Sequence, residues 1–279
     1  MHGGRVALKK QAPAQEATYA RIGWMVRKVE LKELVMNLFK ILAKKIPGAV
    51  NLYRSLRGGV LSLCSKNNGH KNIFTDIFNG NKFGGKDSIS GPGSDLWQTR
   101  VIIKELPPLF RELRVSTLLD IPCGDFHWMN EVELDEIEYI GADIVKDLIK
   151  KNKKNYERKT IHFKHLSLID DKLPKVDLIL CRDCLVHLPF KDIWQTLRNI
   201  CLSKSEYLLT TTFPAREENR DILIGQWRPL NLQLPPFSFP EPLKIMNEAC
   251  KENAGAYSDK SLGLWQVKEL EKSLTKHRI

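Results

Sequence analysis

The sequence predicts an α/β protein with a doubly wound, mostly parallel, seven-stranded sheet and a basic helical extension before it. Three observations support this prediction. Short apolar runs typical of buried strands alternate with runs of helical period over residues 117–212. The first apolar run ends in an acid, Asp120, and is followed by a turn that contains Gly124. The second ends in Asp143, nineteen residues after Gly124.

The N-terminal part of the chain carries most of the charge. The 279 residues include 44 Lys and Arg and 33 Asp and Glu, a net charge of +11. Thirteen of the basic residues and three of the acidic ones lie within residues 1–70. From Trp24 to Ile46, apolar residues recur at helical spacing among lysines and arginines, and Pro47 ends the pattern. We expect residues 1–65 to form an extension whose amphipathic helix docks on an anionic membrane or a partner protein, or packs on its own domain.

Residues 66–100 are rich in Gly, Asn, Ser and Lys, and they predict a cover segment over the ligand site or a plain exposed loop. The first helix begins within this segment, where Ser94 or Asp95 is suited to cap it. The pair Pro107-Pro108 is expected to break that helix. Residues 101–279 are then expected to form the α/β domain.

Strands and helices alternate along this domain. Strands are predicted near 117–121, 138–142, 160–164, 176–181 and 206–212, with helices near 127–133, 145–156 and 190–202. Prolines and aromatic residues then interrupt the pattern over 213–242. An insertion after the fifth strand lies over the carboxyl edge of such a sheet, where ligands bind. We therefore expect residues 213–242 to form a wall of the substrate pocket.

The turn after the first strand indicates the kind of ligand. It lacks both the G-x-G-x-x-G fingerprint of dinucleotide sites and the G-x-x-x-x-G-K-[ST] loop of triphosphate sites. With one glycine between Asp120 and Asp125, it repels phosphate. An acid at the end of the second strand, Asp143, is the residue that holds the two hydroxyls of an adenosine ribose. Together these features favour S-adenosylmethionine over NAD or ATP.

With these motifs the chain resembles the class I S-adenosylmethionine-dependent methyltransferases, a Rossmann-like family, over roughly residues 97–270. Residues 175–188 resemble the family's fourth strand and the loop after it, 207–213 its fifth strand, and 261–267 its last, antiparallel strand. The resemblance implies that the cofactor is bound by Asp120, Pro122, Cys123, Gly124, Asp143, Ile144, Ser167, Cys181 and Arg182. Two positions depart from the family: Pro122 replaces a glycine, and Ser167 stands where an acid often binds adenine.

Methyl transfer from a sulfonium requires alignment and exclusion of water, and a base only if the nucleophile must lose a proton. His187 and Asp183 follow the fourth strand and are the candidate catalytic residues. Alternatively, His187 fixes its own loop and Asp183 pairs with Arg182. In the insertion, Trp227 and Arg228 are candidates for contact with the acceptor, as a flat apolar wall and a fork of donors.

Three functions remain open. The first is a methyltransferase acting on a small-molecule or sugar-like acceptor. The second is a binding protein that keeps the fold without catalysis, which Pro122 and Ser167 favour. The third, an RNA-directed methyltransferase, is disfavoured because the extension has few aromatic residues and residues 71–279 are almost neutral. A nucleic-acid partner is therefore not expected.

The cysteines and the hydropathy predict the compartment. The six cysteines show no disulfide-framework spacing, which indicates a reducing, cytoplasmic setting. Cys181 and Cys184 form a C-x-x-C pair without two further ligands nearby, so no metal is expected. No run is apolar for the roughly 20 residues that span a bilayer. We expect a cytoplasmic protein, with membrane association only through its N-terminal helix.

Overall fold

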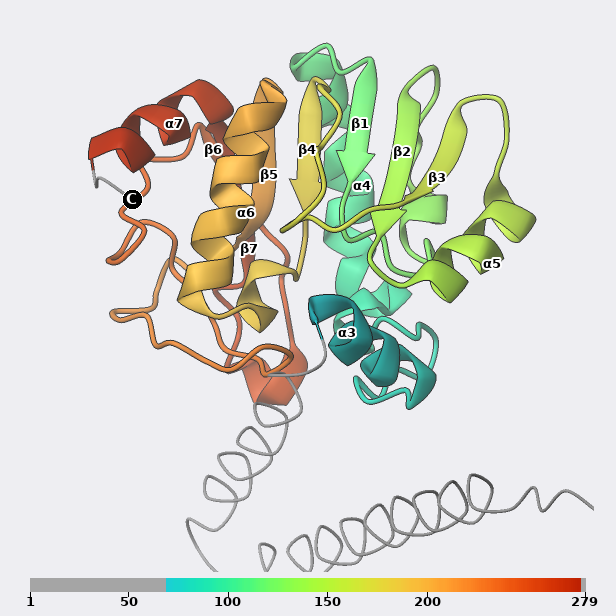
Figure 1. The fold of residues 1–279 in the computed structure, drawn as a ribbon, viewed down its shortest axis with the longest axis horizontal. Coiled ribbons are helices and arrows are strands. Elements are labelled where there is room, and N and C mark those ends of the chain that lie inside the picture. The colour runs from blue at the N-terminus through green and yellow to red at the C-terminus, as the bar shows by residue number, and fades with distance from the viewer. Residues whose placement is uncertain (1–68, 277–279) are drawn as a thin grey trace, which may run out of the picture. The chain divides into compact units, whose positions relative to one another are not determined.

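The computed structural model describes residues 69–276 (Figure 1). The predicted amphipathic helix at 24–46 lies outside the described residues. Within the described part, no helix combines the length and the apolar character needed to cross a bilayer.

A seven-stranded sheet with the order β3-β2-β1-β4-β5-β7-β6 organises the domain. The strands are β1 (Thr117–Asp120), β2 (Glu138–Asp143), β3 (Ile161–His165), β4 (Leu178–Cys181), β5 (Tyr207–Thr212), β6 (Lys244–Asn247) and β7 (Ser261–Gln266). The first five are parallel, and β7 runs antiparallel to both β5 and β6. The predicted fold class is confirmed, including the antiparallel last strand.

The position of the site follows from this strand order. The chain moves outward from β1 to β3 on one side and from β4 onward on the other, so the order reverses between β1 and β4. In doubly wound sheets the ligand binds outside the carboxyl ends of the strands at this switch point. All four residues of β4 are buried, as expected for a central strand covered on both faces.

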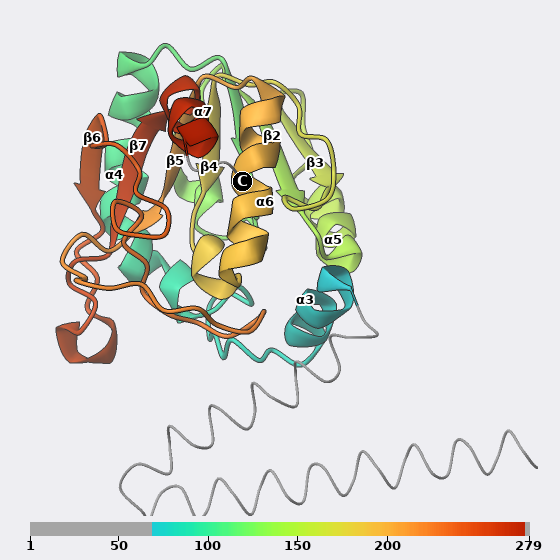
Figure 2. The same cartoon turned by 60° about the vertical axis from the view of Figure 1, so that its left-hand side comes forward.

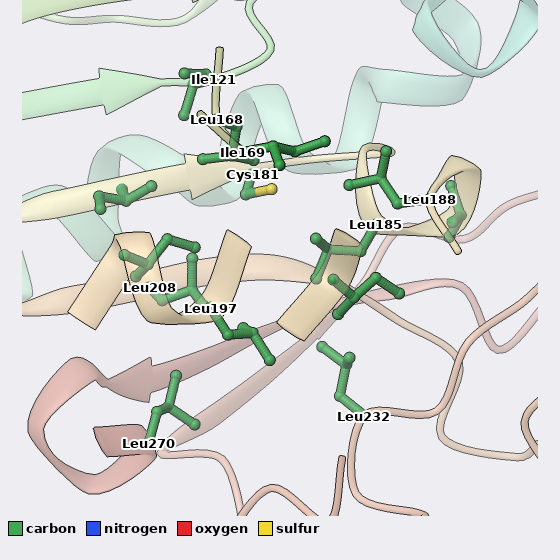
Figure 3. Packing of buried hydrophobic residues seen from close by; sticks show 14 of the residues in the cluster. Ile121, Leu168, Ile169, Cys181, Leu185, Leu188, Leu197, Leu208, Leu232 and Leu270 are labelled. Carbon is green, nitrogen blue, oxygen red and sulfur yellow. The ribbon is translucent and has the colours of Figure 1, made fainter. Parts of the chain in front are cut away.

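Helices cover both faces of the sheet. They are α3 (His70–Asn79), α4 (Leu96–Glu112), α5 (Lys146–Tyr156), α6 (Phe190–Ser203) and α7 (Val267–Lys276). Apolar residues of α6 and α7 pack on one face, while those of α4 and α5 belong to the core on the other (Figure 2). In the first core, Leu197 of α6, Leu208 of β5 and Leu270 of α7 belong to the same cluster (Figure 3).

Helix α4 corrects one prediction, because it continues through Pro107 and Pro108. A proline inside a helix removes a backbone hydrogen bond and crowds the preceding turn. The apolar face of α4 compensates, since Ile102 and Leu106 before the prolines and Phe110 after them are all buried in the core. Packing on the sheet therefore outweighs the local preference for a break.

The helix predicted at 127–133 is also wrong, because only a single 3-10 turn, Met129–Glu131, forms there. Trp128, Met129 and Val132 are buried, and their spacing imitates an amphipathic helix. Phe126, however, has a φ of 62°, which no α-helix accepts. The chain is already extended at Val132, so these residues belong to the turn after β1.

Three further elements have no counterpart among the elements predicted from the sequence. Helix α3 forms inside the Gly-rich segment, strand β6 follows the insertion, and α7 ends the described chain. Strand β6 lies at the edge of the sheet, and of its four residues only Met246 is buried.

Candidate active site

A cavity of about 440 Å³ lies at the carboxyl ends of the central strands. Its walls come from the turn after β1, the end of β2, the loops after β3 and β4, and the end of β5. Helix α3 and the segment after it also contribute to the lining, and α3 lies beyond the arrowheads of β1 and β2 in Figure 1. The cavity therefore opens at the switch point and falls within the size range of small-molecule sites.

Asp143 ends β2 and lines the cavity. Its Oδ1 accepts a hydrogen bond from the Val145 amide at 2.9 Å, and its Oδ2 accepts one from the Gly124 amide at 3.3 Å. Burial raises the pKa of the carboxyl group to about 6, against the lowering effect of these two amides. Asp143 is therefore ionised at neutral pH, held in place by the turn, and able to accept further hydrogen bonds from hydroxyl groups.

The turn after β1 brings its backbone close to the cavity at Gly124. Gly124 has a φ of 55°, and a Cβ atom there would lie 2.2 Å from Ser90 Oγ. Both the conformation and the space therefore require glycine. Its neighbours Pro122 and Cys123 line the same wall.

Asp120, at the end of β1, lines the cavity at a deeply buried position. The Tyr139 hydroxyl donates a 2.7 Å hydrogen bond to its Oδ2. Burial raises the pKa of Asp120 to about 7, although the Tyr139 bond and the Arg182 charge oppose the shift. A positive charge on a ligand in the cavity would favour the ionised form of this carboxyl group.

Apolar side chains adjoin Asp143 and form the wall on the β2 and β3 side. Ile144, Leu148 and Leu166 line this part of the cavity, and Ser167 follows. The Ser167 hydroxyl donates to Asp170 Oδ2 at 2.9 Å, so it already serves the turn after β3. The wall suits a flat apolar ring such as a purine, held mainly by packing.

The segment before α4 closes the cavity and is tied to the sheet at two points. Asp125 accepts hydrogen bonds from the Ser88 hydroxyl at 3.0 Å and from the Ile89 amide at 2.9 Å. Arg182, in the loop after β4, donates a 2.7 Å hydrogen bond to the Gly93 carbonyl. Residues 89–94 thus lie against both strand-end loops and line the cavity between them.

The loop after β4 carries a buried cluster of charges. Arg182 forms a two-pronged pair with Glu248, with contacts of 2.7 and 3.1 Å, and Lys260 donates to Asp183 Oδ2 at 2.6 Å. Burial opposes ionisation of Asp183, but the Lys260 and Arg182 charges outweigh it and lower its pKa to about 2. Arg182, Asp183 and Lys260 all line the cavity. Asp183 is therefore a fixed negative charge and a poor proton acceptor.

His187 follows in the same loop and also lines the cavity. Its Nδ1 lies 2.9 Å from the Gln226 carbonyl oxygen. A carbonyl only accepts, so Nδ1 carries the proton and Nε2 of the neutral ring carries the lone pair. Burial lowers the pKa of the imidazole below 6.5. Of the two catalytic candidates, His187 is thus the one in the protonation state of a base at neutral pH.

The two substrate candidates in the insertion separate in the structure. Trp227 lines the cavity, whereas Arg228 is buried behind the loop after β4. The Arg228 guanidinium donates to the Leu185 and Leu188 carbonyls at 2.8 Å each, and to that of Arg220 at 3.1 Å. These contacts tie the insertion to the loop after β4 and leave Arg228 outside the cavity lining.

Cys181, predicted to bind the cofactor, also lies away from the cavity lining. Its side chain is fully buried in the apolar core beneath the cavity, in the same cluster as Ile169 and Leu185 (Figure 3). The other eight predicted cofactor residues line the cavity. Among the described residues no cluster of metal-binding side chains is found.

Sequence reasoning missed several residues of the site. Lys260 and Tyr257 precede β7, and Phe74, Ile77 and Phe83 belong to α3 and the turn after it, yet all line the cavity. Asp125 was noted in the turn after the first strand, but its hydrogen bonds to Ser88 and Ile89 could not be predicted, because they join positions about 36 residues apart. Only the helical spacing of Phe74, Ile77 and Phe78 gave a local signal that α3 exists.

The residues present fit S-adenosylmethionine. Asp143 offers a carboxylate to a ribose diol, and the positive φ of Gly124 leaves room for close approach of the ligand. The carboxyl groups of Asp120 and Asp143 line the cofactor side of the cavity, whereas that of Asp183 is already paired with Lys260 and Arg182. Asp120 and Asp143 match a ligand with a positively charged sulfonium and oppose one with phosphates.

Comparison with known proteins points to methyltransferases. A family model described as a methyltransferase domain matches residues 119–202, which run from the end of β1 through β2, β3 and β4 to helix α6. Comparison with curated protein sequences finds no match.

Solved structures of methyltransferases share the fold. Human N-acetylserotonin methyltransferase in complex with S-adenosylmethionine aligns with a TM-score of 0.50 and 13% identity, over 77% of this chain and 66% of its own. The alignment thus spans slightly less than two thirds of the human enzyme. Magnesium protoporphyrin IX methyltransferase from Synechocystis aligns with a TM-score of 0.49 and 13% identity, over 71% of this chain and 97% of its own. The Burkholderia thailandensis 1,6-didemethyltoxoflavin-N1-methyltransferase aligns with a TM-score of 0.49 and 13% identity, over 70% of this chain and 86% of its own.

The matched residues 119–202 contain the turn after β1, the strand-end Asp143 and the loop with His187. The α/β domain of this chain thus carries a methyltransferase-domain match over residues 119–202 and shares its fold with a solved S-adenosylmethionine-dependent methyltransferase.

Proposed function

We propose that this methyltransferase acts on a small-molecule acceptor bound in the half of the cavity over β4, β5 and β7. The cofactor lies over β1 and β2, where Asp143 receives the ribose hydroxyls and Gly124 allows close approach. When bound, S-adenosylmethionine supplies an electrophilic methyl group on a sulfonium.

One observation carries this proposal: a single cavity joins the strand-end acid Asp143 to the loop with His187 across the switch point. The two halves differ in their lining. The β2 side offers a carboxylate and apolar walls, and the β4 side offers an unprotonated imidazole nitrogen. A cofactor and an acceptor placed in these halves would meet over β1 and β4, and methyl transfer requires such adjacent binding.

His187 is the proposed proton acceptor. The Gln226 carbonyl fixes its Nδ1 proton, so Nε2 is free to take a proton from a hydroxyl acceptor as the methyl group is transferred. Asp183 is proposed as a positioning residue, because its charge is held by Lys260 and Arg182 and its Oδ1 has no hydrogen-bond partner.

The test is a pH profile of methyl transfer by the full chain and by His187→Gln. Glutamine keeps a side-chain donor for the Gln226 carbonyl and lacks the basic nitrogen. Because burial lowers the pKa of His187 below 6.5, the wild-type rate is expected to rise with pH in the range below 6.5 and to level off by pH 7. His187→Gln is expected to lose the rise and about a hundredfold or more in rate. An unchanged profile in a folded variant would remove His187 from this role.

The proposal also separates an enzyme from a binding protein with the same fold. A binding protein would bind S-adenosylmethionine or its demethylated product without turnover on any acceptor. The described residues favour turnover, because a half-buried neutral histidine lines the acceptor half of the cavity with its Nδ1 proton fixed by the Gln226 carbonyl.

A further inference from the structure

Three aromatic rings gather in the acceptor half of the cavity. Phe213 follows β5, Trp227 lies in the insertion, and Tyr257 lies before β7, and all three line the cavity. The Trp227 and Tyr257 ring centroids are 4.7 Å apart, and Phe213 meets them edge to face at 6.0 and 6.3 Å. We call these residues the aromatic corner.

A fourth ring lies against the proposed base. Phe83, from the turn after α3, has its centroid 4.9 Å from that of His187, with the rings inclined at 38°. Both residues line the cavity. The acceptor half is therefore bounded by ring surfaces from the insertion on one side and from the cover segment on the other.

Most of the charged groups of this half are already paired with each other, and Asp183 Oδ1 is the buried oxygen left without a partner among the described residues there. Lys260 is bonded to Asp183, and Arg182 to Glu248 and to the Gly93 carbonyl. A sugar with several hydroxyls would find few free partners here, and each hydroxyl buried without one carries a desolvation penalty. The lining favours a ligand that presents ring faces and a single polar group.

We propose that the acceptor is a flat aromatic compound with a hydroxyl group on its ring. This inference rests on the proposed function and names the substrate class. The ring packs in the aromatic corner, and the hydroxyl faces His187. The oxygen–methyl bond forms as the carbon–sulfur bond breaks, the electron pair of that bond goes to sulfur, and the hydroxyl proton goes to Nε2 of His187. The products are an aryl methyl ether and the neutral thioether of the cofactor.

The test compares 2-naphthol with decahydro-2-naphthol, its saturated analogue, and with methyl α-glucoside. Aromatic hydroxyls are more acidic than aliphatic ones, so turnover alone would mix recognition with reactivity. Binding is therefore measured by calorimetry on the full chain, without cofactor and with S-adenosylhomocysteine bound, and methyl ether formation is measured by mass spectrometry. We expect 2-naphthol to bind at least tenfold more tightly than either saturated compound and to be methylated.

Variants of the aromatic corner locate the ring. Trp227→Leu and Tyr257→Leu are each expected to weaken 2-naphthol binding by a few-fold to about tenfold, the range of a ring–ring contact, with S-adenosylhomocysteine affinity unchanged. Trp97→Leu is the matched control, because Trp97 is 61% exposed and lies outside the cavity lining. It is expected to leave both affinities unchanged.

Each other outcome counts against the proposal. Equal or tighter binding of a saturated compound overturns the aromatic class and leaves the proposed function standing. The same holds if S-adenosylhomocysteine binds but 2-naphthol does not, or if loss of Trp227 and Tyr257 has no effect on 2-naphthol. Failure of the chain to bind S-adenosylhomocysteine at all is a separate result, and it contradicts the proposed function itself.

Discussion

Substitution of Asp143 gives the sharpest test of the cofactor assignment. The two carboxylate oxygens each accept one backbone amide, from Val145 and from Gly124, which fixes their direction and leaves lone pairs for a ligand. Asp143→Asn keeps the shape of the side chain and one acceptor oxygen. It removes the charge and replaces the other oxygen with a donor, which cannot accept a ribose hydroxyl.

The magnitude follows from these contacts. A hydrogen bond to a charged group contributes about 1.5–3 kcal/mol, and two such bonds to a ribose diol are at stake. A loss of about 3 kcal/mol weakens binding on the order of a hundredfold. Because burial raises the pKa of Asp143 to about 6, wild-type affinity is also expected to fall as pH drops through 6. Protonation removes the charged acceptor, so the Asn variant is expected to lack this dependence.

The assay is calorimetric titration with S-adenosylhomocysteine at several pH values, with circular dichroism to show that each variant is folded. Asp147→Asn is the matched control, since Asp147 is exposed in the first turn of α5 and forms an ion pair with the exposed Lys150. It makes the same change of charge near the site. If Asp143→Asn binds as tightly as wild type, or no more weakly than Asp147→Asn, the reasoning about the ribose is refuted.

Three further outcomes are expected. Gly124→Ala is expected to lower both the melting temperature and the cofactor affinity, because a φ of 55° costs an alanine about 1–2 kcal/mol and the new Cβ would meet Ser90 Oγ. An unchanged melting temperature would contradict this prediction. Arg228→Lys is expected to lose about 3 kcal/mol of unfolding free energy in urea titrations, because one ammonium group cannot bond both carbonyls that the guanidinium joins. Reduced cofactor affinity at full stability would instead indicate a role in the site. Burial raises the pKa of Asp120 to about 7, so its contribution to stability is fully present below about pH 4 and is lost as pH rises through 7. Urea titrations of the wild type are expected to show a loss of roughly 3 kcal/mol between pH 5 and pH 8, and those of Asp120→Asn are expected to lack it.

Most of the sheet could be predicted from the sequence because its central strands are buried on both faces. Such strands are short continuous apolar runs, as in Leu178–Cys181, and helices of clear period separate them. The edge strand Lys244–Asn247 gave no such signal, because only one of its residues is buried. The proline pair in α4 misled the prediction, since the packing that holds the helix together comes from the sheet and is not encoded locally.

The cofactor half of the site could be predicted better than the acceptor half. Asp120, Gly124 and Asp143 lie at strand ends, where sequence position alone indicates a position at the carboxyl edge. Cys181 also lies at a strand end, but its side chain packs in the apolar core. The sequence pattern around β4 did not show on which side of the strand this side chain lies. The aromatic corner comes from three separate loops, so it was visible only once the chain was folded.

The role of Arg228 shows the same limit. An arginine in a loop near a predicted ligand site is equally suited to a ligand or to backbone carbonyls. Which of the two the side chain binds depends on where the Leu185 and Leu188 carbonyls lie in the folded chain. Their position is set by the packing of the insertion against the loop after β4.

Titration of the full chain with S-adenosylmethionine, followed by S-adenosylhomocysteine, tests the central claim most directly. Both ligands are expected to bind at one site per chain with a dissociation constant well below about 1 mM, which corresponds to roughly −4 kcal/mol. ATP and NAD serve as controls and are expected not to compete, because the carboxylates around the turn oppose phosphate. The account is contradicted if neither methyl donor nor product produces heat at about 1 mM ligand, or if ATP displaces them.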